Sequence, residues 1–343
     1  TSAAATPTQT HTTHETHSVT RIIKITRPWR GTAHGTHPGR TDMHYPTRHP
    51  LPTLEDRIVA HLSLSPATRS QLCEALSASA TSQGIDVSRV RAVGVGAPIP
   101  MGRHARVASD AYPSVEDVAS VTGRWWQAVP VVDNTVRMAA FAEGLWGAGS
   151  GMSSFIYLRL SGGVGGCVVS DFRLVGEATG LAGELGHITV AGNDALCGCG
   201  KHGCVETLAS VPALCERAGA RDLRELRAAV HADDERALAA LEGAARAIGY
   251  VLGSAALLIN PKAIIVAGEI VDAFPQIKED IAAHMRAELL PVMEWDIDVV
   301  GASLGPLGAA QGCAYVAAHR APEEDDRERT PLTSGSADEG DGA

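Results

Sequence analysis

The sequence predicts an α/β protein with two lobes. Its 343 residues exceed one typical domain and suffice to bury two cores. Strand-like apolar runs alternate with segments of helical spacing from about residue 90 onward, an order typical of α/β layers. Aromatic residues make up only 4% of the chain, so we expect cores built mainly from Ala, Val, Leu and Ile. The chain shows no internal repeat of solenoid length.

The first 52 residues have the weakest pattern. They are rich in Thr, His, Pro and Arg, and we expect them to be irregular or not native to the fold, apart from one short strand at Ser18–Thr26. Eight histidines fall within residues 1–61, but their scattered spacing indicates adventitious metal affinity at most.

Residues 53–128 are expected to form a small N-terminal lobe. Helical spacing begins at Leu54, and a second helix is expected at Leu72–Ala80. A strand starts at Val90 and ends at the proline turn of residues 98–100, after which another helix begins within Ser114–Ala119.

Residues 129–320 are expected to form the large C-terminal lobe. The final helix, residues 307–318, is placed to pack back on the small lobe. The other expected elements are a strand at Val129–Val132, a helix at Val136–Gly144, a hairpin of Ser153–Leu160 and Gly166–Val169, helices at Val211–Ala218, Leu223–Val230 and Asp234–Asn260, and a buried strand at Ala263–Ala267.

Charge is spread unevenly along the chain, whose net charge is −10. Residues 321–343 hold eight acids and two arginines and are expected to form a disordered acidic tail, while residues 1–50 hold six basic residues and two acids. No apolar run reaches membrane-spanning length, and none near the N-terminus resembles a signal peptide. We therefore expect a cytoplasmic protein without a membrane partner.

One histidine and three cysteines form the most informative motif. His187 is followed by Cys197, Cys199 and Cys204, four side chains that suit a tetrahedral Zn²⁺. Four protein ligands fill the zinc shell, so such a site would be structural. We expect the three glycines among the cysteines, residues 198, 200 and 203, to adopt backbone angles that other residues avoid. Unliganded thiols and a disulfide are the alternatives, and the sequence separation of Cys197 and Cys199 is short for an unstrained bridge.

These residues, in the block GELGH followed by CGCGKHGCVE, resemble the signature of the ROK family of sugar-dependent repressors and sugar kinases. The resemblance covers about residues 85–320 and implies a two-lobed actin/hexokinase-like (ribonuclease H-like) fold with a structural zinc loop. It also implies a homo-oligomer, a dimer or tetramer. The other matching segments are Val90–Pro100, Pro130–Glu143, Leu160–Val169, Leu257–Glu269 and Ser303–Ala310.

The resemblance implies four sugar-binding residues: Asn134, Glu184, His187 and Glu206. Ionised carboxylates accept hydrogen bonds from sugar hydroxyls, and such charge-assisted bonds are strong. The expected ligand is a monosaccharide or amino sugar. Without the surrounding motif, Glu206 would be interpreted as an ordinary first-turn helix acid.

The kinase features of the family are degenerate here. Thr135 stands where the family kinases have the aspartate of an Asn-Asp pair, so no catalytic residue is predicted, and Asp133 is displaced by roughly 6 to 7 Å along a strand. The first phosphate loop is not recognisable in residues 1–60, and Ile99 replaces a usual glycine. The second loop lacks its hydroxyl and has Cys167 in place of its last glycine. The degenerate nucleotide and phosphate positions are Gly162, Gly163, Gly165 and Gly268.

Three hypotheses follow. The first is a regulator-type sugar sensor lacking a recognisable DNA-binding head, because the stretch Ile58–Ala80 leaves no room for a recognition helix and wing and is better interpreted as a small-lobe helix. DNA binding by this chain alone is then not expected. The second is an ATP- and Mg²⁺-dependent hexose or N-acylhexosamine kinase, similar to glucokinase. The third is a truncated product whose first 50 residues are not native to the family.

Overall fold

The computed structural model describes residues 69–82, 84, 86–90, 92–98, 128–176, 180–290 and 297–320. The predictions for residues 1–52, for the helices at Leu54 and Ser114–Ala119 and for the acidic tail lie outside the described residues. The predicted lobe boundaries stay predictions.

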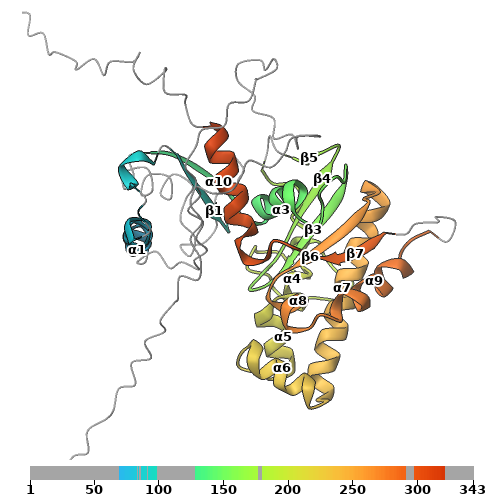
Figure 1. Ribbon diagram of the computed structural model, residues 1–343. Helices are drawn as coiled ribbons and strands as arrows, with labels where there is room; N and C mark the ends of the chain where they lie inside the picture. Colours follow the sequence, from blue (N-terminus) through green and yellow to red (C-terminus); the bar gives the residue numbers. More distant parts are fainter. Residues whose placement is uncertain are drawn as a thin grey trace, which may run out of the picture.

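A five-stranded mixed sheet forms the centre of the large lobe, in the order β5-β4-β3-β6-β7 (Figure 1). β3 and β4 pair as an antiparallel hairpin, whereas β3–β6 and β6–β7 are parallel. The strands are β3 Phe155–Leu160, β4 Val164–Ser170, β5 Arg173–Leu174, β6 Ala263–Ala267 and β7 Asp298–Gly301.

The sheet is apolar on both faces. Successive side chains of a strand point to opposite faces, so Ile156 and Leu158 belong to one core and Phe155 and Tyr157 to the other. Both faces therefore need a helical cover, and each has one.

Helices that follow the hairpin cover the first face, with α7 at the centre of that core. Ser210, Asp222 and Asp234 cap the starts of α5, α6 and α7 with side-chain oxygens. By length and composition α7 could cross a membrane, but more than half of it is buried, as in the core helix of a globular protein. These helices are α4 Glu206–Ala209, α5 Val211–Ala218, α6 Leu223–His231, α7 Glu235–Ile259, α8 Glu269–Ala273 and α9 Ile277–Ala287.

Helix α3 covers the second face, and α10 packs in the same core between α3 and the parallel pair β1–β2 (Figure 1). Close approach depends on glycine here, because a Cβ at Gly94 would overlap the Cys313 carbonyl and one at Gly312 would overlap the Met138 carbonyl. The remaining elements are α1 Arg69–Ser82, β1 Ala92–Ala97, β2 Val129–Asn134, α3 Thr135–Trp146, α10 Gly308–Arg320 and the 3₁₀ turns Val87–Arg89, Leu185–His187 and Gly305–Leu307.

The element predictions are confirmed for the hairpin, the helices predicted between residues 211 and 260 and the strand Ala263–Ala267, and the first described helix contains the predicted Leu72–Ala80. The sequence interpretation missed β5, β7, α4, α8 and α9. β5 has two residues and β7 has four, so neither offers enough alternation to be recognised.

Candidate functional site

The four predicted metal ligands lie together. The ligand atoms of His187, Cys197, Cys199 and Cys204 all fall within 4.8 Å of one another. Cys197 Sγ is 3.6 Å from His187 Nδ1, and the sulfurs of Cys199 and Cys204 are 3.7 Å apart. Zinc–ligand bonds of about 2.0–2.3 Å in a tetrahedron place ligand atoms roughly 3.5–3.8 Å apart. All seven cysteines of the chain are described and none forms a disulfide. The cluster therefore fits one tetrahedral ion.

Short backbone pairings shape the ligand loop. Thr189 pairs with Cys204 and Leu196 with His202, and the Cys197 N–H donates to the Lys201 carbonyl at 2.8 Å. Glycines 200 and 203 have φ of +89° and +79°, as expected. The expectation for Gly198 is wrong, because it is not among the described glycines with positive φ. The chain reverses directly after Cys199, at Gly200. The loop therefore needs a left-handed backbone conformation only at residues 200 and 203.

Strand β4 brings the separate site segments together, because its glycines let backbone and side chains approach closely. A Cβ on Gly165 would come within 2.6 Å of Val136 Cγ2, at the start of α3. A Cβ on Gly166 would come within 2.6 Å of the Gly183 carbonyl oxygen. In the reverse direction, a Cβ on Gly186 would overlap the Val164 carbonyl oxygen. The start of α3 and the Glu184–His187 turn therefore both lie against β4.

Glu206 joins the ligand loop to the hairpin turn. Its Oε2 accepts the Val164 N–H at 2.9 Å, and its Oε1 lies 3.6 Å from Cys197 Sγ. A Cβ on Gly163 would come within 2.7 Å of the same Oε2. Glu206 thus has a structural role between the hairpin and the Cys/His cluster, in addition to its predicted contact with sugar.

Glu184 and Asn134 belong to the two segments that lie against β4. Glu184 is exposed and makes no cap bond to its own 3₁₀ turn. The surrounding protein nevertheless desolvates its carboxyl in part, and this desolvation raises the pKa of Glu184. The negative charge of Glu206 raises that pKa further, whereas His187 and Arg137 lower it. Asn134 caps α3, with its Oδ1 accepting from the N–H groups of Val136 at 2.8 Å and Arg137 at 3.2 Å.

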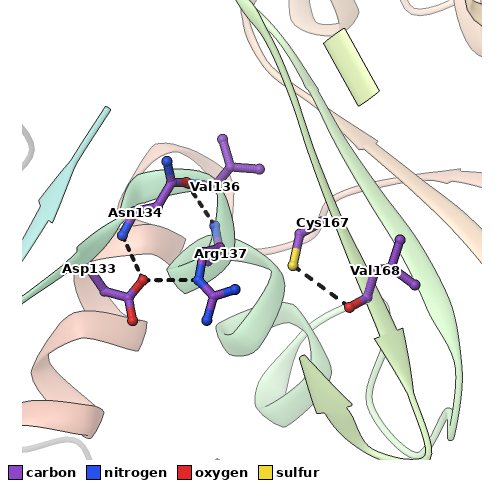
Figure 2. Close-up of polar contacts among 6 residues, drawn as sticks. All are labelled: Asp133, Asn134, Val136, Arg137, Cys167 and Val168. Atoms are coloured by element: carbon purple, nitrogen blue, oxygen red, sulfur yellow. Dashed lines mark hydrogen bonds and ion pairs between the residues drawn. The ribbon is translucent and has the colours of Figure 1, made fainter. Parts of the chain in front are cut away.

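The turn from β2 into α3 carries an internal ion pair (Figure 2). Oδ1 of the buried Asp133 accepts from Arg137 Nε at 3.1 Å and from the Asn134 N–H at 2.7 Å. Thr135 is the first residue of α3. A Cβ on Gly96 would lie 3.5 Å from its hydroxyl, so Thr135 Oγ1 is beside β1.

The predicted phosphate-side glycines also converge. Residues 161–163 form the turn of the β3–β4 hairpin, and the Ser161 hydroxyl accepts the Glu269 N–H at 3.3 Å. Gly268 has φ of +106° and lies against the Leu160 backbone, where a side chain would collide. Gly162, Gly163 and Gly268 therefore lie at one end of β3.

The sequence comparison decides the family. The sequence profile of the ROK family matches residues 65–320, about three quarters of the chain. The chain belongs to the ROK family. Its two-lobed α/β architecture is the actin/hexokinase-like fold of that family.

Relatives of this ROK protein include both enzymes and repressors. It is 30% identical over 202 residues to a glucokinase of Halalkalibacterium halodurans, covering 52% of this chain and 61% of the relative. It is 28% identical over 193 residues to a xylose repressor of Bacillus spizizenii, covering 55% and 50%. The chain thus spans between half and two thirds of the length of these curated relatives. A solved ROK glucokinase of Streptomyces griseus, in complex with glucose and AMPPNP, aligns with a TM-score of 0.64 and 25% identity over 77% of this chain and 92% of that one.

Two buried charged residues of this ROK protein were missed from the sequence. Arg137 is 4% exposed and pairs with Asp133. Glu143 is 2% exposed and accepts from Ala148 N–H at 2.7 Å, Ser303 N–H at 2.9 Å, Leu304 N–H at 2.8 Å and the Ser303 hydroxyl at 3.2 Å. The available signal was a lone arginine and a lone glutamate in the otherwise apolar helix TVRMAAFAEGLW.

Proposed function

We propose that this ROK protein is a regulator-type sugar sensor, which holds one structural zinc and binds a monosaccharide or amino sugar without phosphorylating it. The observation that carries the proposal is the β2–α3 turn, where Thr135 begins α3 and the nearby carboxylate of Asp133 is held by Arg137. The family resemblance assigns the base to the position of Thr135.

Phosphoryl transfer to a sugar needs a group that takes the proton of the attacking hydroxyl. A threonine hydroxyl is not a base near neutral pH. Oδ1 of Asp133 already accepts two hydrogen bonds, one from the Asn134 N–H and one from the Arg137 guanidinium, so this oxygen is engaged within the turn. The turn therefore favours binding over catalysis.

The zinc proposal rests on donor chemistry and spacing. Three thiolates and one imidazole suit Zn²⁺, and four ligands leave no open position for a catalytic water. When bound, the ion would fix His187 and the ligand loop. Glu206, which directly follows that loop, accepts a hydrogen bond from the Val164 N–H of β4. The protein would thus present Glu184 and Glu206 at fixed positions.

Sugar binding is supported by the convergence of three segments on β4. Glu184 and Glu206 supply carboxylate oxygens that accept hydrogen bonds from sugar hydroxyls. Asn134 caps the start of α3, and His187 ends the 3₁₀ turn that follows Glu184. We further propose a cytoplasmic location, since thiolate ligands are kept reduced there. The family resemblance supports a homo-oligomer, a dimer or tetramer.

The alternative function is an ATP- and Mg²⁺-dependent sugar kinase. The glucokinase relative and the solved glucokinase with glucose and AMPPNP favour it. In that case Gly162, Gly163, Gly165 and Gly268 would line the nucleotide phosphates, since they gather at the hairpin turn and the end of β3. The two functions differ in turnover and share sugar binding.

Sugar binding is tested by calorimetry on zinc-loaded protein with a panel of hexoses, amino sugars and N-acylhexosamines. A ligand with a millimolar or tighter dissociation constant is expected, with a matching rise of the melting temperature by mass action. If well-folded, zinc-loaded protein binds none of these sugars at millimolar concentration, the sensor proposal is wrong.

A further inference from the structure

The buried guanidinium of Arg137 is only partly satisfied. Its Nε donates to Asp133 Oδ1 at 3.1 Å, but its Nη1 is buried without a hydrogen-bond partner in the part of the chain that the structure describes. Arginine stays charged at all ordinary pH values and carries only donors. A buried charged donor without an acceptor is unfavourable, so such a group in a folded protein calls for a bound partner.

Neighbouring groups do not supply that partner. Figure 2 shows the guanidinium between the Asp133 carboxylate and the Cys167 side chain. Burial raises the pKa of the Cys167 thiol to about 12, so it is a neutral, weak acceptor. Asp133 Oδ1 is shared with the Asn134 N–H. Among the described residues, the guanidinium thus bonds to Asp133 Oδ1, which it shares with the Asn134 N–H, and Nη1 is left without an acceptor.

The guanidinium lies on the side of the proposed sugar site. Arg137 is three residues from Asn134 on the first turn of α3, and its charge acts on both Cys167 of β4 and Glu184. Gly183, which precedes Glu184, lies against Cys167, since a Cβ there would be 3.0 Å from Cys167 Cα. Arg137, β4 and the Glu184 turn are thus contiguous.

We propose that Arg137 is a specificity-determining residue, whose Nη1 donates to a carboxylate or phosphate oxygen of an anionic hexose derivative bound between Asn134 and Glu184. This deepens the proposed function and rests on it. An oxyanion satisfies both the unpaired donor and the charge, whereas a neutral hydroxyl satisfies the donor alone. Thr135 is compatible with this ligand because it places no further negative charge at the turn. Glu184 and Glu206 would repel an oxyanion beside them, which confines the anionic group to the Arg137 side.

The test is calorimetry on zinc-loaded full-length chain with three probes: glucose, glucuronate and glucose 6-phosphate. At least one anionic probe should bind tenfold or more tightly than glucose, a difference of about 1.4 kcal/mol. A preference for glucuronate identifies the anionic group of the ligand as a carboxylate, and a preference for glucose 6-phosphate identifies it as a phosphate. Arg137→Gln should reduce the preference below about threefold, because the donor to the anionic group is lost. The matched control is Arg159→Gln, a partly buried arginine on β3 outside this turn, which should keep the full preference.

The outcomes separate this inference from the proposed function. Glucose binding without any anionic preference overturns the inference and leaves the sensor proposal standing, whereas no binding of any probe counts against both. An anionic preference that Arg137→Gln preserves also overturns the inference. If Arg137→Gln does not fold, as judged by circular dichroism and zinc content, Arg137→Lys replaces it: the charge remains but the fork of donors is lost. The preference should then fall by at least threefold, and an unchanged preference overturns the assignment.

Discussion

Replacing Gly186 by alanine should weaken the contact that holds the Glu184–His187 turn on β4. The added Cβ would overlap the carbonyl oxygen of Val164, which is backbone and cannot rotate away. Either β4 or the 3₁₀ turn must move, and the turn carries a predicted zinc ligand. The change therefore tests whether this close approach assembles the site.

The magnitude follows from two opposing effects. Overpacking costs roughly 1–3 kcal/mol, while alanine stiffens the unfolded chain and recovers about 0.4–1 kcal/mol. Because the obstructing atom is backbone, we expect the net loss to be about 2 kcal/mol. For a domain of this size class that lowers the melting temperature by about 4–8 °C.

The assay is thermal unfolding of zinc-loaded protein, with metal content measured on the same sample. Gly198→Ala is the matched control in the same region, because a Cβ there meets nothing within 4 Å and its φ is not positive. Its effect should stay within about 0.5 kcal/mol. If Gly186→Ala melts within 1 °C of the unmodified protein, or if both variants fall equally, the close approach of Gly186 to β4 does not hold the site together.

Three further predictions concern the site and its support. Purified protein should contain about one zinc per chain, because three thiolates and one imidazole suit a closed zinc site. Cys199→Ser should lower the zinc content and loosen the loop before Glu206. Metal analysis that finds no zinc in protein prepared without chelators would rule out the zinc site. Glu184→Gln should weaken sugar binding by roughly tenfold or more at unchanged zinc content, since charge-assisted acceptors are lost; equal affinity by calorimetry would exclude Glu184 from the sugar site. Glu143→Gln should destabilise the fold by about 2–4 kcal/mol, because one buried carboxylate accepts four donors, and an unchanged urea midpoint would contradict this.

The gathering of His187 with the three cysteines could be predicted from the sequence because its spacing is local. His187 and Cys204 are separated by 16 intervening residues, and the short loop between them forces any compact fold to bring the ligands close. The strand Ala263–Ala267 could also be predicted from the sequence, since a continuous apolar run between turns indicates a strand buried on both faces.

The charged contacts could not be predicted, because they depend on tertiary packing. Glu143 bonds to residues 160 and 161 positions away, and no local pattern marks that partner. Arg137 looks from the sequence like a solvent-exposed helix residue, and only the packing of α3 on the sheet buries it. Glu206 was interpreted as a sugar ligand, and its bond to the Val164 N–H required the hairpin register.

The most direct test of the central claim is a coupled ADP-release assay on zinc-loaded protein with Mg²⁺, ATP and a panel of hexoses and N-acylhexosamines. We expect sugar-dependent ADP release far below about 1 s⁻¹, because loss of a general base alone removes roughly 10² to 10⁴ in rate. Thr135→Asp should restore little or no turnover, since the first phosphate loop is still not recognisable in residues 1–60. Sugar-dependent turnover by the unmodified chain at about 1 s⁻¹ or more, within the ordinary range of enzymes, would contradict the account and identify the protein as a kinase.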